Sequence, residues 1–223
     1  MVIVDFGLNQ LFVREISRNK NLASKYLFNG IIIKIFLAVI AMSFAYLFLY
    51  VMDYSAQTKT VAYIMLLFAL LQSFNELSFS IFRAFERMYY EMGIKILRML
   101  LLIGSVFYLV KNNYGLVYSV MAFPVTEFIV LCVAALLVYF KFAKIRFEFD
   151  FKFSKMMVKE SSLFFFSIIF TTLYLYVDQI IISKLRSTTE VGIYSAAANI
   201  AIALIFIPLM YANSVYPVIS RFY

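Results

Sequence analysis

Six charged side chains that could do chemistry lie within or beside long apolar runs of this chain. Three are carboxylates and three are bases: Glu76, Glu127, Asp178, Lys34, Arg83 and Arg98. A carboxylate in an apolar setting can exchange a proton or a cation, and a base there can bind an anion. Such charges cost several kcal/mol unless they are solvated or paired, so each is a candidate functional residue.

Glu76 belongs to a polar stripe in the apolar run 61–82. The stripe has the three- and four-residue spacing of one helical face, and its members are Gln72, Glu76, Ser80, Arg83 and Arg87. Glu76 lies about two turns from the end of the run, too far for its short side chain to leave the apolar region easily. We therefore expect Glu76 to face a bundle interior or a water-filled cavity, with structural pairing as the alternative.

Asp178 and Glu127 occur in comparable settings. Asp178 ends a second stripe, in the run 161–183, near its end. An ion pair with Lys184 or Arg186 is the alternative there to a functional role. Glu127 follows Pro124 by three residues, and a proline frees a backbone carbonyl where a helix kinks around a site. The other members of the second stripe are Ser167, Thr171 and Tyr174.

Composition identifies the kind of protein that must position these residues. Hydrophobic residues make up 65% of the 223 and charged residues 14%, and the mean hydropathy is +0.92. A soluble domain is usually nearer half apolar and a quarter charged. Lipid removes the need for a polar surface, so we expect an integral membrane protein.

The rarer residue types exclude several kinds of site. The chain has no His, and its single cysteine, Cys132, stands in an apolar run. Imidazole catalysis, His-ligated metals, disulfides and thiolate clusters are therefore excluded. The six glycines form neither a phosphate-binding loop nor a dinucleotide motif. We predict no enzymatic activity, no metal and no cofactor.

A helix that crosses the hydrocarbon core of a bilayer needs roughly 20 apolar residues, and six segments of this chain are that long. An all-α, polytopic transmembrane helix bundle is therefore predicted. The first thirteen residues are too few to cross, and we expect them to end a helix whose beginning is missing. The predicted spans are 26–52, 61–82, 89–110, 112–140, 161–183 and 191–220.

Three bases lie inside these spans. Glu91 and Lys95 have the favourable acid-to-base spacing of four residues, and Lys95 can extend to the headgroups. Arg98 lies deeper on the same face, where it could bind an anion. Lys34 lies about 12 Å from the start of its helix. Its side chain could therefore either extend to the headgroups or line a cavity.

The basic residues also predict an orientation. Thirteen of the twenty fall in alternate loops, at 14–25, 83–88, 141–160 and the C-terminus, and four fall in the opposite loops. This bias places the richer side in the cytoplasm. The net charge of +8 is then explained by topology and anionic lipid headgroups, and no nucleic-acid partner is needed.

The segment 141–160 is the one sizeable polar stretch. Phenylalanines alternate with charged residues from 147 to 153. Between two spans, this pattern favours a linker at the membrane surface, with its rings in the interface and its charges in water. Ser154 could cap the helix that follows.

Several phrases together resemble one family of transporters. VDFGLNQLFVREISRNK resembles the segment closing the second helix of polysaccharide flippases, and FRAFERMYYE the turn after their fourth. YVDQIIIS at 176–183 and VGIYSAAANIAIALIFIPLMYANSVYPVISRFY at 191–223 are similar to their seventh and eighth helices. These flippases, with the O-antigen flippases among them, form the polysaccharide branch of the multidrug/oligosaccharidyl-lipid/polysaccharide (MOP) exporter superfamily.

The resemblance implies a fold of two six-helix bundles around a central cavity, of which this chain would hold the end of helix two through helix eight. Residues 1–140 would be an N-terminal bundle without its first helix. Residues 141–160 would be the cytoplasmic linker, and 161–223 the first two helices of the second bundle. At Leu163–Phe164 the family often has proline instead. Because two helices alone would form the second wall of the cavity, we expect the chain to be a fragment, a split-gene product or one piece of an oligomer.

The resemblance also implies a function. It predicts a flippase in the cell membrane that moves polyprenyl-linked glycans across by alternating access. Lys34, Arg83 and Arg98 would attract the lipid-linked phosphate, and Glu76, Glu127 and Asp178 would couple transport to an ion gradient. The partners would be membrane lipids, the glycan substrate and the rest of a longer or split transporter.

Three alternatives remain. A cation-coupled exporter of drugs or metabolites belongs to the same superfamily, and an inactive membrane fragment would explain the missing helices. A membrane-embedded glycosyl- or acyltransferase lacks support, because the chain has no His, no Asp-x-Asp motif and no extramembrane domain to hold a sugar nucleotide.

Overall fold

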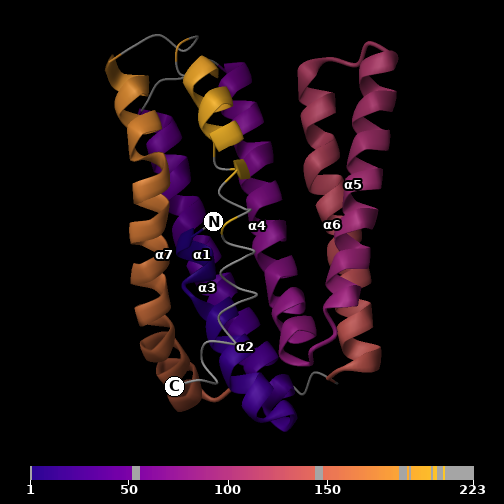
Figure 1. The fold of residues 1–223 in the computed structure, drawn as a ribbon, viewed down its shortest axis with the longest axis vertical. Helices are drawn as coiled ribbons and strands as arrows, with labels where there is room; N and C mark the ends of the chain where they lie inside the picture. The colour runs from indigo at the N-terminus through magenta and orange to yellow at the C-terminus, as the bar shows by residue number, and fades with distance from the viewer. Residues whose placement is uncertain are drawn as a thin grey trace. The chain divides into compact units, whose positions relative to one another are not determined.

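The computed structural model describes residues 2–51, 56–143, 148–185, 190, 192–201, 203–204 and 208. This described part has seven α-helices and no strand, which confirms the predicted all-α class (Figure 1). A short 3-10 turn, η1, covers Lys20–Leu22. The helices are α1 (Val2–Asp5), α2 (Leu8–Arg18), α3 (Ala23–Val51), α4 (Ala56–Ala84), α5 (Met88–Lys111), α6 (Leu116–Lys141) and α7 (Phe151–Leu185).

Five segments are long and apolar enough to cross a membrane: Lys20–Val51, Ala56–Ala84, Met88–Lys111, Leu116–Lys141 and Phe151–Leu175. They confirm five of the predicted spans, including the one at 89–110 that carries three charges. Most of the sixth, 191–220, lies outside the described residues, although 192–201 are helical.

Two compact units divide the chain at Ile168–Ile169, inside α7. In the first unit, α4 packs closely against both α6 and α2, and α5 packs on α6. The most apolar windows of α4 and α6 are 39% buried, whereas those of α5 and of the η1–α3 segment are 6% buried. The outer helices therefore expose rings such as Phe36 and Phe107, as expected for a surface solvated by lipid.

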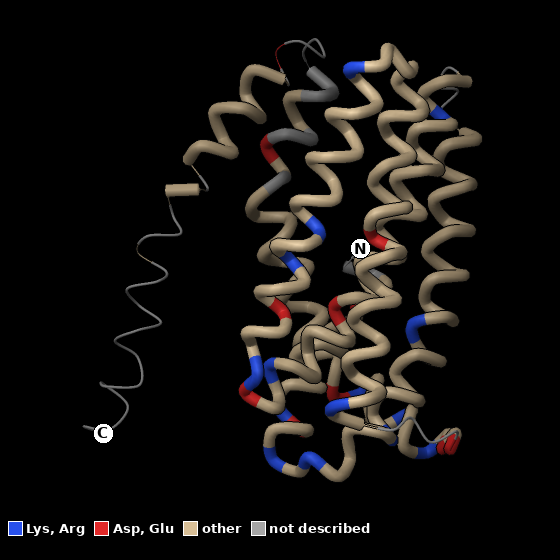
Figure 2. Tube along the Cα trace, turned by 90° about the vertical axis from the view of Figure 1, so that its right-hand side faces the viewer, with Lys and Arg blue, Asp and Glu red and all other residues tan. Residues whose placement is uncertain are grey.

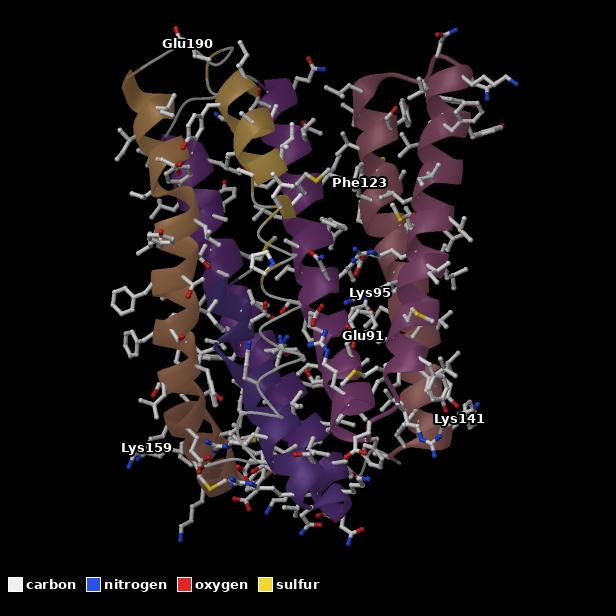
Figure 3. The ribbon with its side chains drawn as sticks, viewed as in Figure 1. Glu91, Lys95, Phe123, Lys141, Lys159 and Glu190 are labelled. Atoms are coloured by element: carbon white, nitrogen blue, oxygen red, sulfur yellow. The ribbon has the colours of Figure 1, made fainter. Side chains whose placement is uncertain are left out.

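The charged residues of the first unit gather at one end of its helices. Figure 2 shows more of the coloured segments at the lower end of the helices than at the upper end. Lys141 and Lys159 both lie at this end (Figure 3). The predicted C-terminal basic residue lies outside the described residues.

Residues 2–13 are helical apart from a break between α1 and α2. Phe6 and Gly7 have φ angles of 40° and 71°, in the left-handed region that favours glycine. The break also allows a close approach to α7. A Cβ added at Gly7 would lie 2.6 Å from the carbonyl oxygen of Ser161 and 2.7 Å from the Cβ of Phe164.

The start of α7 is fixed to α3 by one buried amide. The Nδ2 of Asn29 donates to the carbonyl oxygens of Lys25 (2.9 Å) and Glu148 (3.2 Å). Its Oδ1 accepts from the backbone N–H of Asp150 (3.0 Å) and from Ser154 Oγ (2.9 Å). All hydrogen-bonding positions of this amide are therefore occupied, although no periodic pattern in the sequence marks Asn29.

The predicted cap of this helix was wrong. Ser154 lies inside α7, which begins at Phe151 rather than after Ser154. Asp150 is the capping residue instead, because its Oδ1 accepts a hydrogen bond from the backbone N–H of Phe153 at 3.0 Å. The alternating phenylalanines that favoured a linker at the membrane surface continue into the first turn of this helix.

Gly7→Ala tests the close approach between the α1–α2 break and α7. We expect a loss of about 1–3 kcal/mol in unfolding free energy, because the added methyl meets backbone and the φ angle is unfavourable. Thermal unfolding in detergent measures it. Gly104→Ala is the matched control, because nothing lies within 4 Å of a Cβ there. Equal effects of the two substitutions would contradict this packing.

Acid should weaken the attachment of α7. Lys25 Nζ donates to Asp150 Oδ2 at 2.7 Å, and this bond, helped by the Phe153 N–H, lowers the pKa of Asp150 below its usual 3.8. The resulting stability is fully present above the unfolded-state pKa and is lost as pH falls through the lower folded-state pKa.

The variant Asp150→Asn keeps a capping side chain and removes only the charge. We expect it to melt at a lower temperature than the wild type by an amount that is constant from neutrality down to about pH 4. Below that pH the difference should shrink. If the difference in melting temperature between wild type and variant grew on acidification, it would contradict this ion pair.

Candidate functional site

Buried and partly exposed polar side chains of the first unit form three clusters. The Lys34 cluster comprises Asp5, Asn9, Lys34 and Ser73. The Glu127 cluster comprises Asn75, Arg98 and Glu127, and the Arg83 cluster comprises Glu76, Arg83, Glu91 and Lys95. Five of the six predicted site residues belong to these clusters.

Lys34 is fully buried, with 0% exposure. Its Nζ lies 2.8 Å from Asp5 Oδ1, 2.9 Å from Ser73 Oγ and 2.5 Å from the Ser73 carbonyl oxygen. Ser73 Oγ donates in turn to Asp5 Oδ1 at 2.6 Å. The three N–H groups of the ammonium are therefore matched by three acceptors. Lys34 does not extend to the headgroups, and it joins α1, α3 and α4.

Glu127 is also buried, with 1% exposure, but it is incompletely paired. Asn75 Nδ2 donates to Glu127 Oε1 at 2.8 Å and to the Glu127 carbonyl oxygen at 3.2 Å. Glu127 Oε2 and Asn75 Oδ1 have no hydrogen-bond partner among the described residues. Arg98 Nη1 approaches Oε2 at 3.5 Å, as an ion pair without a hydrogen bond.

A half-satisfied carboxylate in a low-dielectric interior is costly to keep charged. Glu127 can lower that cost by drawing Arg98 closer. Because α4 and α5 both pack on α6, such a movement would be felt by both neighbouring helices. This cluster is therefore the one best suited to change its state.

The Arg83 cluster is charge-balanced. Arg83 donates from Nε and Nη2 to the two carboxylate oxygens of Glu91, at 2.8 and 2.5 Å. Its Nη2 also donates to Glu76 at 3.2 Å. Lys95 donates to Glu91 at 2.6 Å, which confirms the predicted pair, and Figure 3 shows Glu91 and Lys95 adjacent. Two carboxylates and two bases thus join the end of α4 to the start of α5.

Asp178 lies in the second unit. Its Oδ2 accepts a hydrogen bond from the Tyr194 hydroxyl. The side chains of the alternative partners, Lys184 and Arg186, lie outside the described residues.

The sequence identified the charged site residues better than it identified the residues that bond to them. Asp5, Ser73 and Asn75 were not among the predicted site residues. Asp5 had a detectable signal, as a charge interrupting an apolar stretch. Asn75 is adjacent to Glu76 and therefore lies on another face than the polar stripe, where no periodic pattern marked it.

These features define a polytopic helical membrane protein with paired charges inside its bundle. A family model described as "Polysaccharide biosynthesis protein" matches residues 1–223. The chain therefore belongs to this family of polysaccharide biosynthesis proteins, the flippase family that the motifs resembled. Its members are generally transporters rather than enzymes. Searches of curated proteins and of solved structures found no match.

Lys34→Met should destabilise the protein strongly, because it leaves the Asp5 carboxylate buried without its cation. Breaking a buried ion pair typically costs about 3–5 kcal/mol, and adding Asp5→Asn should recover part of the loss. Thermal unfolding of the single and double variants measures this coupling. Lys95→Met is the control, because that side chain is 44% exposed. If the effects of Lys34→Met and Asp5→Asn on the unfolding free energy were additive, Lys34 and Asp5 would not be paired.

Proposed function

We propose that this protein is part of a flippase that moves lipid-linked oligosaccharides from the cytoplasmic to the outer leaflet of the cell membrane. Family membership and the five candidate spans support a membrane transporter of polysaccharide precursors. The observation that carries the proposal is the Glu127 cluster, in which a buried and incompletely bonded carboxylate faces the partly exposed Arg98.

In this proposal Arg98 binds the lipid-linked phosphate and Glu127 is the coupling carboxylate. When Glu127 is ionised, it attracts Arg98 from α5. When Glu127 takes up a proton, that attraction ends, and the guanidinium can bind an anion instead. Uptake of a proton and binding of the substrate would thus favour each other, as linkage requires.

The other candidates have different roles in this proposal. Lys34 and Arg83 are bonded to carboxylates, so we assign them to holding the helices around the site rather than to primary phosphate binding. Glu76 helps to hold Arg83. Asp178 remains a second coupling carboxylate, positioned by Tyr194.

The proposed orientation places the charged end of the first unit in the cytoplasm, according to the positive-inside rule. Residues 141–160 would then form the cytoplasmic connection between an N-terminal bundle, 1–140, and the start of a second bundle, 161–223. The partners would be membrane lipids and the polyprenyl-linked glycan.

Transport in proteoliposomes tests the proposal with a fluorescent lipid-linked oligosaccharide. We expect Glu127→Gln and Arg98→Gln each to lower the initial flipping rate roughly tenfold or more, which corresponds to about 1.4 kcal/mol. The matched control is Glu86→Gln, an exposed carboxylate in the α4–α5 turn, which should flip at the wild-type rate.

Unchanged flipping in Glu76→Gln, Glu127→Gln and Asp178→Asn would refute the role of the carboxylates. Export of cationic drugs without any flipping by the wild type would instead identify a small-molecule exporter. Absence of both activities would identify an inactive membrane chain.

A further inference from the structure

Two adjacent tyrosines near the start of α5 each contact an exposed base. The ring centres of Tyr89 and Tyr90 are 4.3 Å apart. The guanidinium carbon of Arg87 lies 6.0 Å from the centre of the Tyr89 ring, and Lys141 Nζ lies 4.9 Å from the centre of the Tyr90 ring. Because α5 and α6 pack together, these four residues form one surface across two helices, which we call the tyrosine patch.

The tyrosine patch lies at the depth of the lipid headgroups. Arg87 immediately precedes the candidate span Met88–Lys111, and Lys141 is the last residue of the candidate span Leu116–Lys141. Tyrosine rings are enriched at this level of a membrane, and basic side chains there extend toward the headgroups. Both bases are exposed, and Tyr89 is 51% exposed, so the patch faces the surroundings of the bundle.

Neither base of the tyrosine patch is neutralised by a carboxylate. None of the ion pairs among the described residues includes Arg87 or Lys141. The neighbouring Glu86 is exposed and also stands outside these pairs. An aromatic ring attracts a cation through its quadrupole but carries no net charge. The patch therefore keeps two positive charges, unlike the charge-balanced Arg83 cluster.

The same side chains have hydrogen-bond donors to offer. Lys141 Nζ donates to the Tyr90 hydroxyl at 2.9 Å, and Arg87 Nη1 donates to the Tyr89 hydroxyl at 3.5 Å. Because each hydroxyl oxygen accepts from a base, its own O–H can donate to a further group. The ammonium and the guanidinium also carry more N–H groups than these contacts use. Such a set of charged donors suits the oxygens of a phosphate.

A third base extends the patch along a row of rings. Lys20 Nζ lies 5.6 Å from the centre of the Phe85 ring. The Phe85 and Tyr90 rings both contact the ring of Phe142, at centre-to-centre distances of 5.3 and 5.4 Å. Lys20 is exposed and begins the candidate span Lys20–Val51. Three spans therefore present a base at this level, which is suited to an anionic membrane surface.

Apolar side chains continue the patch into the span. Met88 and Met92 lie one turn apart on α5 and are 60% and 61% exposed. An acyl chain attached to a phosphate at the patch would pack against them. A free phosphate needs no such surface, and an acidic protein segment in water does not reach it. The combination of bases, hydroxyls and an adjoining apolar strip favours a phospholipid.

We propose that the tyrosine patch binds the headgroup of an anionic phospholipid. Its phosphate is held between Arg87 and Lys141, and its acyl chains lie along Met88 and Met92. This site is separate from the Glu127 cluster, and the inference does not depend on the proposed function.

Tryptophan quenching in liposomes tests the site at its own position. The chain has no tryptophan, so Met92→Trp provides a single fluorophore that phospholipids brominated high on their acyl chains quench on contact. We expect phosphatidylglycerol to bind there with about fivefold or greater preference over phosphatidylcholine. Adding Arg87→Gln and Lys141→Gln together should reduce the preference to about twofold or less, and each alone should reduce it in part.

Lys111→Gln is the matched control, because Lys111 is an exposed lysine at the other end of α5. It should leave the preference at Met92→Trp unchanged. Phe107→Trp, at a position that is 67% exposed and four residues before Lys111, is the matched reporter and should show a weaker preference. Equal preference at the two reporters would indicate a general attraction to the net charge of +8 and would overturn the inference.

Two further results would also overturn it. One is a preference for phosphatidylglycerol that persists when both bases are replaced. The other is a preference that soluble glycerol 3-phosphate or a heptaglutamate peptide abolishes, because the occupant would then be a free phosphate or an acidic protein segment. The substituted side chains are exposed, and the two single variants keep the test decisive even if the double variant does not insert into the liposomes.

Discussion

Hydrocarbon supplies neither counter-charges nor hydrogen bonds, so a charge on one of these helices must find both inside the bundle. Much of the arrangement of the first unit depends on this constraint. Lys34 is fully buried because Asp5 and Ser73 surround its ammonium group, and that contact draws the short α1 onto α3 and α4. Many apolar side chains face outward, and others form a buried hydrophobic cluster among the helices. The interior is thus held together by polar contacts and apolar packing, while the outward-facing apolar surface is compatible with lipid.

The three clusters differ in how completely this constraint is met. The ammonium of Lys34 has an acceptor for each of its N–H groups, and the Arg83 cluster balances two bases with two carboxylates. Among the described carboxylates, Glu127 is the one with a fully buried oxygen that has no hydrogen bond, with Arg98 at 3.5 Å. Fully paired charges fix helices in place, whereas an incompletely bonded one can change partner. This contrast supports the proposal that Glu127 couples ion uptake to substrate binding.

The sequence predicted the elements well because helices in lipid must be long and apolar, and because basic loops share one side. It also identified the charges, because each interrupts an apolar run. Apart from the Glu91–Lys95 pair, it did not identify their partners. Asn29, Ser73 and Asn75 are small polar residues without periodicity, and their roles depend on which helices pack together. The cap of α7 was assigned to Ser154 rather than Asp150 because alternating phenylalanines concealed the start of that helix.

The central claim is that Glu127 gains a proton when Arg98 binds the substrate. Difference infrared spectroscopy in nanodiscs tests it most directly, because a protonated carboxyl has its own C=O stretching band. At constant pH, adding lipid-linked oligosaccharide should produce that band in the wild type and in Glu86→Gln, but not in Glu127→Gln or Arg98→Gln. A band of equal size in Glu127→Gln, or no band in the wild type, would contradict the account.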